Sequence, residues 1–152
     1  MGSPVSPAKK NMVTRNLGDL LLLRQNVETP SDAEWNECLE HLGRFRSDFS
    51  RAKVLVITDG GGPTPEQRKR LAAVLQGSRV RVAVVSEALK FRFIVSSVAL
   101  FIPDIASFQT HQMERAYDHL KMTRSERRTA DAAIAEMSSQ MAGAPRRSAA
   151  QQ

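Results

Sequence analysis

The chain has 152 residues, a hydrophobic fraction of 41% and a charged fraction of 25%, which are the proportions of a globular protein with one core. The single cysteine, Cys38, excludes an intramolecular disulfide and a cysteine-based metal cluster, and it favours a reducing, cytoplasmic location. The formal net charge of +6 invites a nucleic-acid interpretation, but only 5% of residues are aromatic and the basic clusters are short. We therefore expect a solvated basic surface rather than a nucleic-acid interface.

Both ends of the chain differ in composition from its middle. Residues 1–10 hold two prolines, two serines and a lysine pair without the apolar segment of a secretory signal, so we expect a disordered lead-in. Residues 123–152 have helical propensity over 130–141 but little apolar mass, and we expect a flexible basic tail that is helical in part when bound. The domain itself is predicted to span 11–122. Its longest apolar stretch, 93–102, is far shorter than the ~20 residues that cross a bilayer.

Two strands and a helix are predicted in the first part of the domain. The apolar segments 12–17 and 19–25 flank a glycine-aspartate turn and are typical of paired strands. Ser31 and Glu34 then match a capping box, which opens a helix that runs to about Phe49. The apolar stripe of this helix consists of Trp35, Cys38, Leu39, Leu42, Phe45 and Phe49.

Two side chains of this helix belong to residue types that often carry chemistry. Cys38 lies within the apolar stripe, so we interpret it as a small buried hydrophobe rather than a reactive thiol. His41 lies off the stripe beside two glutamates, and we expect it on the surface. Neither position predicts a catalytic group.

The middle of the domain joins a strand, a glycine loop and a capped helix with almost no spacer. Residues 54–57 are a β-branched-rich apolar run typical of a buried strand, and they lead into the sequence DGGG. Thr64, Pro65 and Gln67 then match the N-cap, the first helical residue and the capping-box partner of a helix that ends near Leu75. In open α/β sheets, ligands and partners bind at such junctions, beyond the carboxyl ends of the strands.

A further helix is predicted to be apolar on more than one face. The remaining elements, in order, are a strand at 79–85, this helix at 87–101, a strand at 105–108 and a helix opened by Thr110. Leu89, Phe93 and Leu100 lie away from the stripe that would face the sheet. Burial in a small fold is one interpretation, and an apolar interface for self-association or for an apolar ligand is the other.

The order and texture of these elements resemble a known family. The segments that carry the resemblance are PSDAEWNECL, VLVITDGGGPTPEQRKRL and VRVAVVSE, within about residues 12–122. They resemble the STAS domain of bacterial anti-sigma factor antagonists, and more closely a divergent STAS-like group related in fold to the CRAL-TRIO lipid-binding domains. The resemblance implies a single α/β domain with a central mixed sheet of about five strands and about four helices. It also implies a regulatory protein of signal transduction.

Thr64 is the candidate phosphorylation site that this resemblance implies. In typical STAS antagonists a serine or threonine at the start of the second helix is phosphorylated, and the added charge switches partner binding. The usual Asp-Ser-Ser-Gly pattern is replaced here by DGGGPT, which leaves Thr64 as the one hydroxyl of the loop. A phosphate there would gain from the helix dipole. The competing interpretation is that Thr64 is an ordinary N-cap.

The loop and the helix after it are the predicted contact surface for a protein partner. The residues assigned to this surface are Asp59, Gly60, Gly61, Gly62, Arg68 and Arg70. Glycine backbone at a helix N-terminus can also cradle an anion, but no Lys-Ser or Lys-Thr pair follows, and the spacing fits no nucleotide-binding motif.

Catalysis and metal binding are not predicted. His41, His111 and His119 have neither a nucleophile at an elbow nor a ligand cluster near them in the sequence. We therefore expect no enzymatic activity, no cofactor and no metal. The function predicted from the sequence is a regulatory or scaffolding module that binds a protein partner, and the alternative is binding of an apolar small molecule or lipid between the helix at 87–101 and the sheet.

Overall fold

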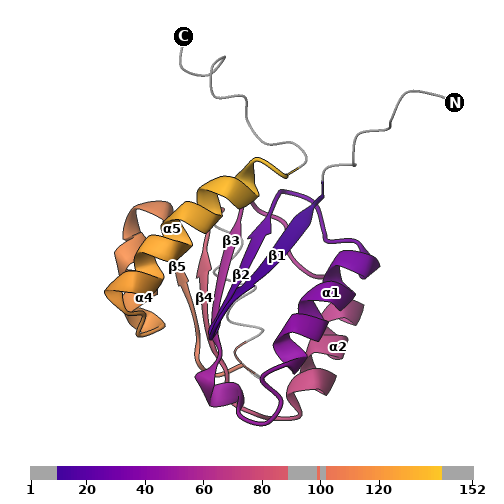
Figure 1. Ribbon diagram of the computed structural model, residues 1–152. Helices are drawn as coiled ribbons and strands as arrows, with labels where there is room; N and C mark the ends of the chain where they lie inside the picture. The colour runs from indigo at the N-terminus through magenta and orange to yellow at the C-terminus, as the bar shows by residue number, and fades with distance from the viewer. Residues whose placement is uncertain (1–9, 89–98, 100–101, 142–152) are drawn as a thin grey trace, which may run out of the picture.

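The computed structural model describes residues 10–88, 99 and 102–141. They form a mixed five-stranded sheet with helices on both faces (Figure 1). The strands are β1 (Met12–Leu17), β2 (Leu20–Gln25), β3 (Lys53–Thr58), β4 (Arg81–Val85) and β5 (Ile105–Phe108), and they lie side by side in chain order. β1 pairs with β2 antiparallel, and all other pairs are parallel. The predicted α/β fold with a mixed sheet is confirmed.

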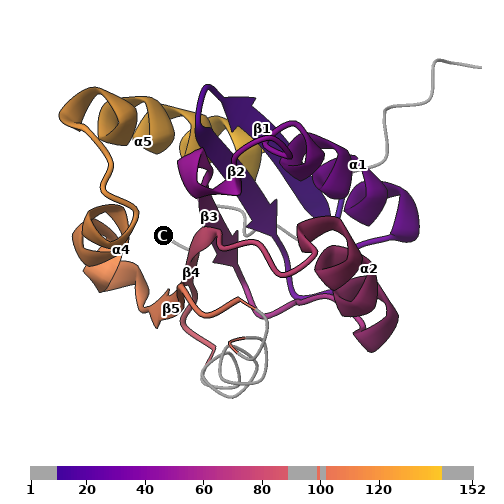
Figure 2. The ribbon, with the colours of Figure 1, turned by 90° about the horizontal axis from the view of Figure 1, so that it is seen from below.

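Helices cover the two faces of the sheet in pairs. In the described part of the chain these are α1 (Asp32–Gly43), α2 (Pro65–Leu75), α4 (Met113–His119) and α5 (Arg124–Ser138). Figures 1 and 2 show α1 and α2 on one face and α4 and α5 on the other. Because both faces are covered, the inner strands are apolar on both sides.

The four consecutive leucines of β2 illustrate this double burial. Leu21 and Leu23 pack in the core beneath α1 and α2, whereas Leu20 and Leu22 pack in the core beneath α4 and α5. The strand register then places Leu22 next to Leu55, and Leu55 next to Ala83, in one row across the second face. A strand rather than a helix is therefore the right assignment for this segment, as the sequence predicts.

The predicted start of α1 is confirmed, but its predicted end is not. Ser31 and Glu34 form the capping box that opens the helix, and the helix ends at Gly43 rather than near Phe49. A short 3-10 turn, Phe49–Arg51, follows after Asp48, whose carboxylate accepts from the Ser50 backbone. The apolar stripe survives this break, because Phe45 and Phe49 still pack in the core beneath α1 and α2.

Two further predictions need correction. Thr110 does not open the predicted helix, since it is the first residue of a 3-10 turn, Thr110–Gln112, and α4 begins after that turn at Met113. His41 is half-buried rather than on the surface, and its Nδ1 is buried without a hydrogen-bond partner in the part of the chain that the structure describes.

The domain also extends beyond residue 122, where the sequence analysis places its end. Thr123 and Glu126 form a capping box that opens α5. Ala130, Ala133 and Met137 of this helix are buried against the sheet, as is Met141 just after it. Glu126 also pairs with Lys53 of β3 at 2.8 Å. Short alanine side chains allow this helix to approach the sheet closely, although it has few large apolar residues. The prediction of a tail considered only the small apolar mass of the segment and did not include this close approach.

The predicted helix at 87–101, with Leu89, Phe93 and Leu100, lies largely outside the described residues. Within the described ranges, no helix has the length and apolar character needed to cross a membrane.

Candidate functional site

The glycine loop after β3 folds back onto the loop between β2 and α1. Asp59 and Gly61 donate backbone hydrogen bonds to the carbonyls of Gln25 and Asn26, at 2.9 and 2.8 Å. The Thr58 hydroxyl donates to the Gly61 carbonyl at 2.7 Å and accepts from the Gly60 N–H at 3.1 Å. Gly60 and Gly61 are buried as a result. The backbone of this loop is therefore engaged inside the protein.

Gly61 is required by this close approach. A Cβ atom at this position would lie 2.0 Å from the Glu28 carbonyl oxygen and 2.6 Å from that of Asn26. Both are backbone atoms that cannot swing aside, so only glycine fits. The glycine run thus has a packing role that the sequence pattern does not distinguish from a ligand cradle.

Asp59 lies at the outer edge of the same loop and pairs with Arg24. The Arg24 Nη2 lies 3.0 Å from Asp59 Oδ1, and its Nε donates to the Ser138 hydroxyl of α5 at 3.1 Å. Asp59 is 37% exposed, so one of its sides still faces solvent. This network joins the loop to the helix on the opposite face of the sheet.

Thr64 caps α2 as predicted. Its hydroxyl accepts from the Gln67 N–H at 3.1 Å, and the Gln67 side chain accepts from the Thr64 N–H at 3.0 Å. The Gln67 amide also donates to the Pro30 carbonyl at 2.9 Å, and the Trp35 indole donates to the Gln67 carbonyl at 2.9 Å. Arg70 pairs with Asp32 at 3.1 Å. The N-terminal half of α2 is therefore fixed to α1.

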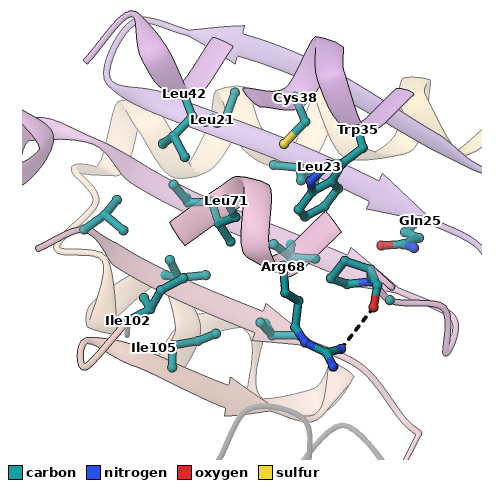
Figure 3. A pocket seen from close by; sticks show the side chains of 17 residues that line it. Leu21, Leu23, Gln25, Trp35, Cys38, Leu42, Arg68, Leu71, Ile102 and Ile105 are labelled. Carbon is teal, nitrogen blue, oxygen red and sulfur yellow. Dashed lines mark hydrogen bonds between the residues drawn. The ribbon is translucent and has the colours of Figure 1, made fainter. Parts of the chain in front are cut away.

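A cavity of about 110 Å³ lies between this pair of helices and the sheet (Figure 3). Its walls come from both layers and from the connections beside them. The described residues that line it are Leu21, Leu23, Gln25, Trp35, Cys38, Leu42, Val54, Val56, Gly62, Pro63, Arg68, Leu71, Val80, Val82, Val84, Ile102 and Ile105. Four valines on the sheet face leave space that larger side chains would fill.

The polar groups of the cavity gather toward one end. Figure 3 shows Gln25 and the Arg68 guanidinium near the carboxyl ends of the strands, with Leu42 and Ile102 toward the other end. The Arg68 Nη1 donates to the Pro63 carbonyl at 3.1 Å. Ligand pockets commonly combine apolar walls with a few polar groups in this way.

The structure separates the residues that the sequence analysis assigns to one surface. Gly62 and Arg68 line the cavity, Gly60 and Gly61 are buried in the loop, and Arg70 pairs with α1. The cavity walls were not predicted, because Trp35 and Cys38 belong to the predicted apolar stripe of a helix and residues 54–57 to a predicted buried strand, and neither pattern indicates a cavity. A face of valines opposite a single tryptophan is the signal that points to incomplete filling.

Cys38 keeps its thiol protonated in this setting. Burial raises the pKa of Cys38 to about 12, and a hydrogen bond with the Thr14 side chain opposes that rise. A neutral thiol is a poor nucleophile. Cys38 is therefore a wall residue of the cavity, in agreement with its assignment as a small buried hydrophobe.

The described ranges hold no group of three or more His, Cys, Asp or Glu side chains placed to bind a metal ion. Comparison of the chain with protein-family models, with curated proteins and with solved structures found no match.

We predict that Gly61→Ala lowers the free energy of unfolding by at least about 2–3 kcal/mol, because the new methyl group meets backbone atoms. Urea denaturation measures this change. Gly43→Ala is the matched control, since its methyl group would meet only the Arg46 guanidinium, at 3.3 Å, and alanine favours the helix. Equal stability of the two variants would contradict the packing role of Gly61.

A second prediction concerns alkaline pH. The unfolded chain releases the Cys38 proton near pH 9.0, whereas the folded chain holds it until about pH 12. Stability from this group is therefore complete below pH 9.0 and declines as the pH rises, by up to ~1.4 kcal/mol per pH unit. Urea denaturation at about pH 8 and about pH 10.5 should show a steeper loss for the wild type than for Cys38→Ala. Parallel losses would refute the assignment.

Proposed function

We propose that this chain is a non-enzymatic binding module that holds a small apolar molecule in the cavity between the sheet and helices α1 and α2. The cavity itself is the observation that carries the proposal. Its walls are largely aliphatic, and its polar groups lie toward one end, which would orient a bound molecule.

The size of the cavity supports a ligand with a tail of about six carbon atoms. Its volume of about 110 Å³ is of the same order as an engineered apolar cavity of about 150 Å³ that stays dry and binds benzene. An unfilled apolar cavity costs stability because its walls lose dispersion contacts. A ligand that restores those contacts stabilises the folded chain, by an amount that grows with the ligand concentration relative to its dissociation constant.

The resemblance to the STAS-like group supports the same proposal from another direction. That group is related in fold to lipid-binding domains, and membership of this chain in it is part of the proposal. The ligand position expected from the sequence is between the helix at 87–101 and the sheet, and that helix lies largely outside the described residues. Among the described residues, the cavity has walls from α1 and α2, represented by Trp35 and Leu71.

Trp35 provides the measurement that tests this proposal. It is the sole tryptophan of the chain and lines the cavity, so a bound molecule should change its fluorescence. We predict saturable binding of 1-hexanol, read from Trp35 fluorescence, together with a rise in the thermal unfolding midpoint. Val56→Phe fills the cavity from the sheet side and should abolish both effects.

Ile57→Phe is the matched control for Val56→Phe. Ile57 is the next residue of β3 and packs with the core beneath α4 and α5, so the same ring on the opposite face leaves the cavity open. We expect this variant to bind 1-hexanol as the wild type does, although overpacking lowers the stability of both variants by about 1–3 kcal/mol. Binding that persists in Val56→Phe, or no binding to the wild type, would refute the proposal.

A second proposed function is recruitment of a protein partner through the 59–70 region, with phosphorylation of Thr64 as a switch. The observation that favours it is the exposed outer side of α2, where Glu66 and Lys69 are 75% and 77% exposed and pair with each other at 3.6 Å. This side presents charge on a helix whose start is fixed by a capping box.

Exchange of the two charges, in a Glu66→Lys and Lys69→Glu double variant, keeps the helix and its ion pair but inverts the surface. We predict that a partner that copurifies with the wild type is lost from this variant, whereas 1-hexanol binding is unchanged. Thr64→Glu should also weaken the partner complex, and Thr64→Ser should preserve it because it keeps the cap. Unchanged recovery of the partner from both charged variants would contradict this function.

A further inference from the structure

Arg68 is a half-buried cation that faces the cavity. It extends from α2 toward the end of the cavity where Gln25 lies (Figure 3). Its Nη1 donates to the Pro63 carbonyl, which is the one hydrogen bond of its guanidinium in the described part of the chain. A guanidinium carries five N–H donors in a planar fork. Most of its hydrogen-bonding capacity is therefore not used by the described residues.

No carboxylate side chain neutralises Arg68. All sixteen aspartate and glutamate residues of the chain lie within the described ranges, and none forms an ion pair with this guanidinium. Four of the other half-buried arginines do have such a partner, namely Arg15, Arg24, Arg70 and Arg127, whereas Arg81 donates to the His119 carbonyl instead and does not line the cavity. Arg68 thus differs from its neighbour Arg70, two residues along the same helix, in having no counter-charge.

A half-buried cation beside an apolar cavity has lost part of its hydration, and a bound anion would offset that loss. A carboxylate is the planar, singly charged group that matches one guanidinium fork, through two parallel charge-assisted hydrogen bonds. The cavity continues from this point between aliphatic walls. The site therefore combines one anion-binding group with one apolar compartment.

We propose that the ligand of this cavity is a monocarboxylic acid with an apolar tail of about six carbon atoms. Its carboxylate pairs with the Arg68 guanidinium at the end near Gln25 and Pro63, and its tail lies between the sheet and the helices α1 and α2. This inference rests on the proposed function, because it names the chemistry of the molecule that the cavity holds.

Hexanoate and 1-hexanol form the probe pair that isolates the contribution of Arg68. Both have six carbon atoms, but one of those of hexanoate is its carboxylate carbon, so its apolar tail is one carbon shorter, a difference that works against the expected preference. Titrations near pH 7.5, followed by Trp35 fluorescence and by calorimetry, should give the wild type at least a tenfold preference for hexanoate, since hydrogen bonds to charged groups are the stronger kind. In Arg68→Gln this preference should disappear, while the affinity for 1-hexanol stays within about twofold.

Arg70→Gln is the matched control. Arg70 is also a half-buried arginine of α2, but it pairs with Asp32 and does not line the cavity, so its loss should leave the preference unchanged. Arg68→Lys keeps the charge but not the planar fork and should retain part of the preference. This second variant keeps the test decisive if Arg68→Gln does not fold.

The outcomes distinguish the two proposals. If 1-hexanol binds and hexanoate binds no more tightly, or if the preference for hexanoate survives in Arg68→Gln, the carboxylate assignment is overturned and the cavity remains an apolar site. If neither probe binds the wild type, the proposed function fails and the ligand assignment fails with it.

Discussion

The contact between the glycine loop and the loop that follows β2 controls the geometry of this end of the protein. With no side chain at Gly61, its backbone lies against the carbonyls of Asn26 and Glu28, and the loop closes over the strand ends. This closure fixes where α2 begins, and the capping box of Thr64 and Gln67 then sets its direction. The positions of Gly62 and Arg68 beside the cavity follow from that backbone contact.

On the opposite face of the sheet, side-chain contacts rather than a backbone contact hold the helix α5. Arg24 of β2 bonds with Asp59 of the glycine loop and with Ser138 of α5, so one side chain joins the strand ends to the last described helix. At the other end of the strands, Lys53 and Glu126 join β3 to the start of the same helix. The layers are thus tied at both ends, while the aliphatic middle of the first face is incompletely filled.

Local signals in the sequence predict most of this architecture. The capping boxes at Ser31 and Thr64 and the alternation of the leucines of β2 depend on near neighbours, so the sequence contains the information that sets them. The place of α5 and the cavity depend on distances between layers, which periodicity does not encode. Gly61 is an intermediate case. A run of glycines in the sequence predicts a loop, but it does not predict the backbone against which that loop packs.

The matching of spatial strand order to chain order has a consequence for how the protein folds. Each strand pairs with the one made just before it, so the sheet can grow by successive addition, over a tight turn between β1 and β2 and over longer crossovers between the parallel strands. α5 is the exception, since its contact between Ser138 and Arg24 spans 114 residues. Closing so long a loop has an entropic cost, so we expect α5 to dock late in folding and the part of the sheet that it covers to stay open to self-association until then.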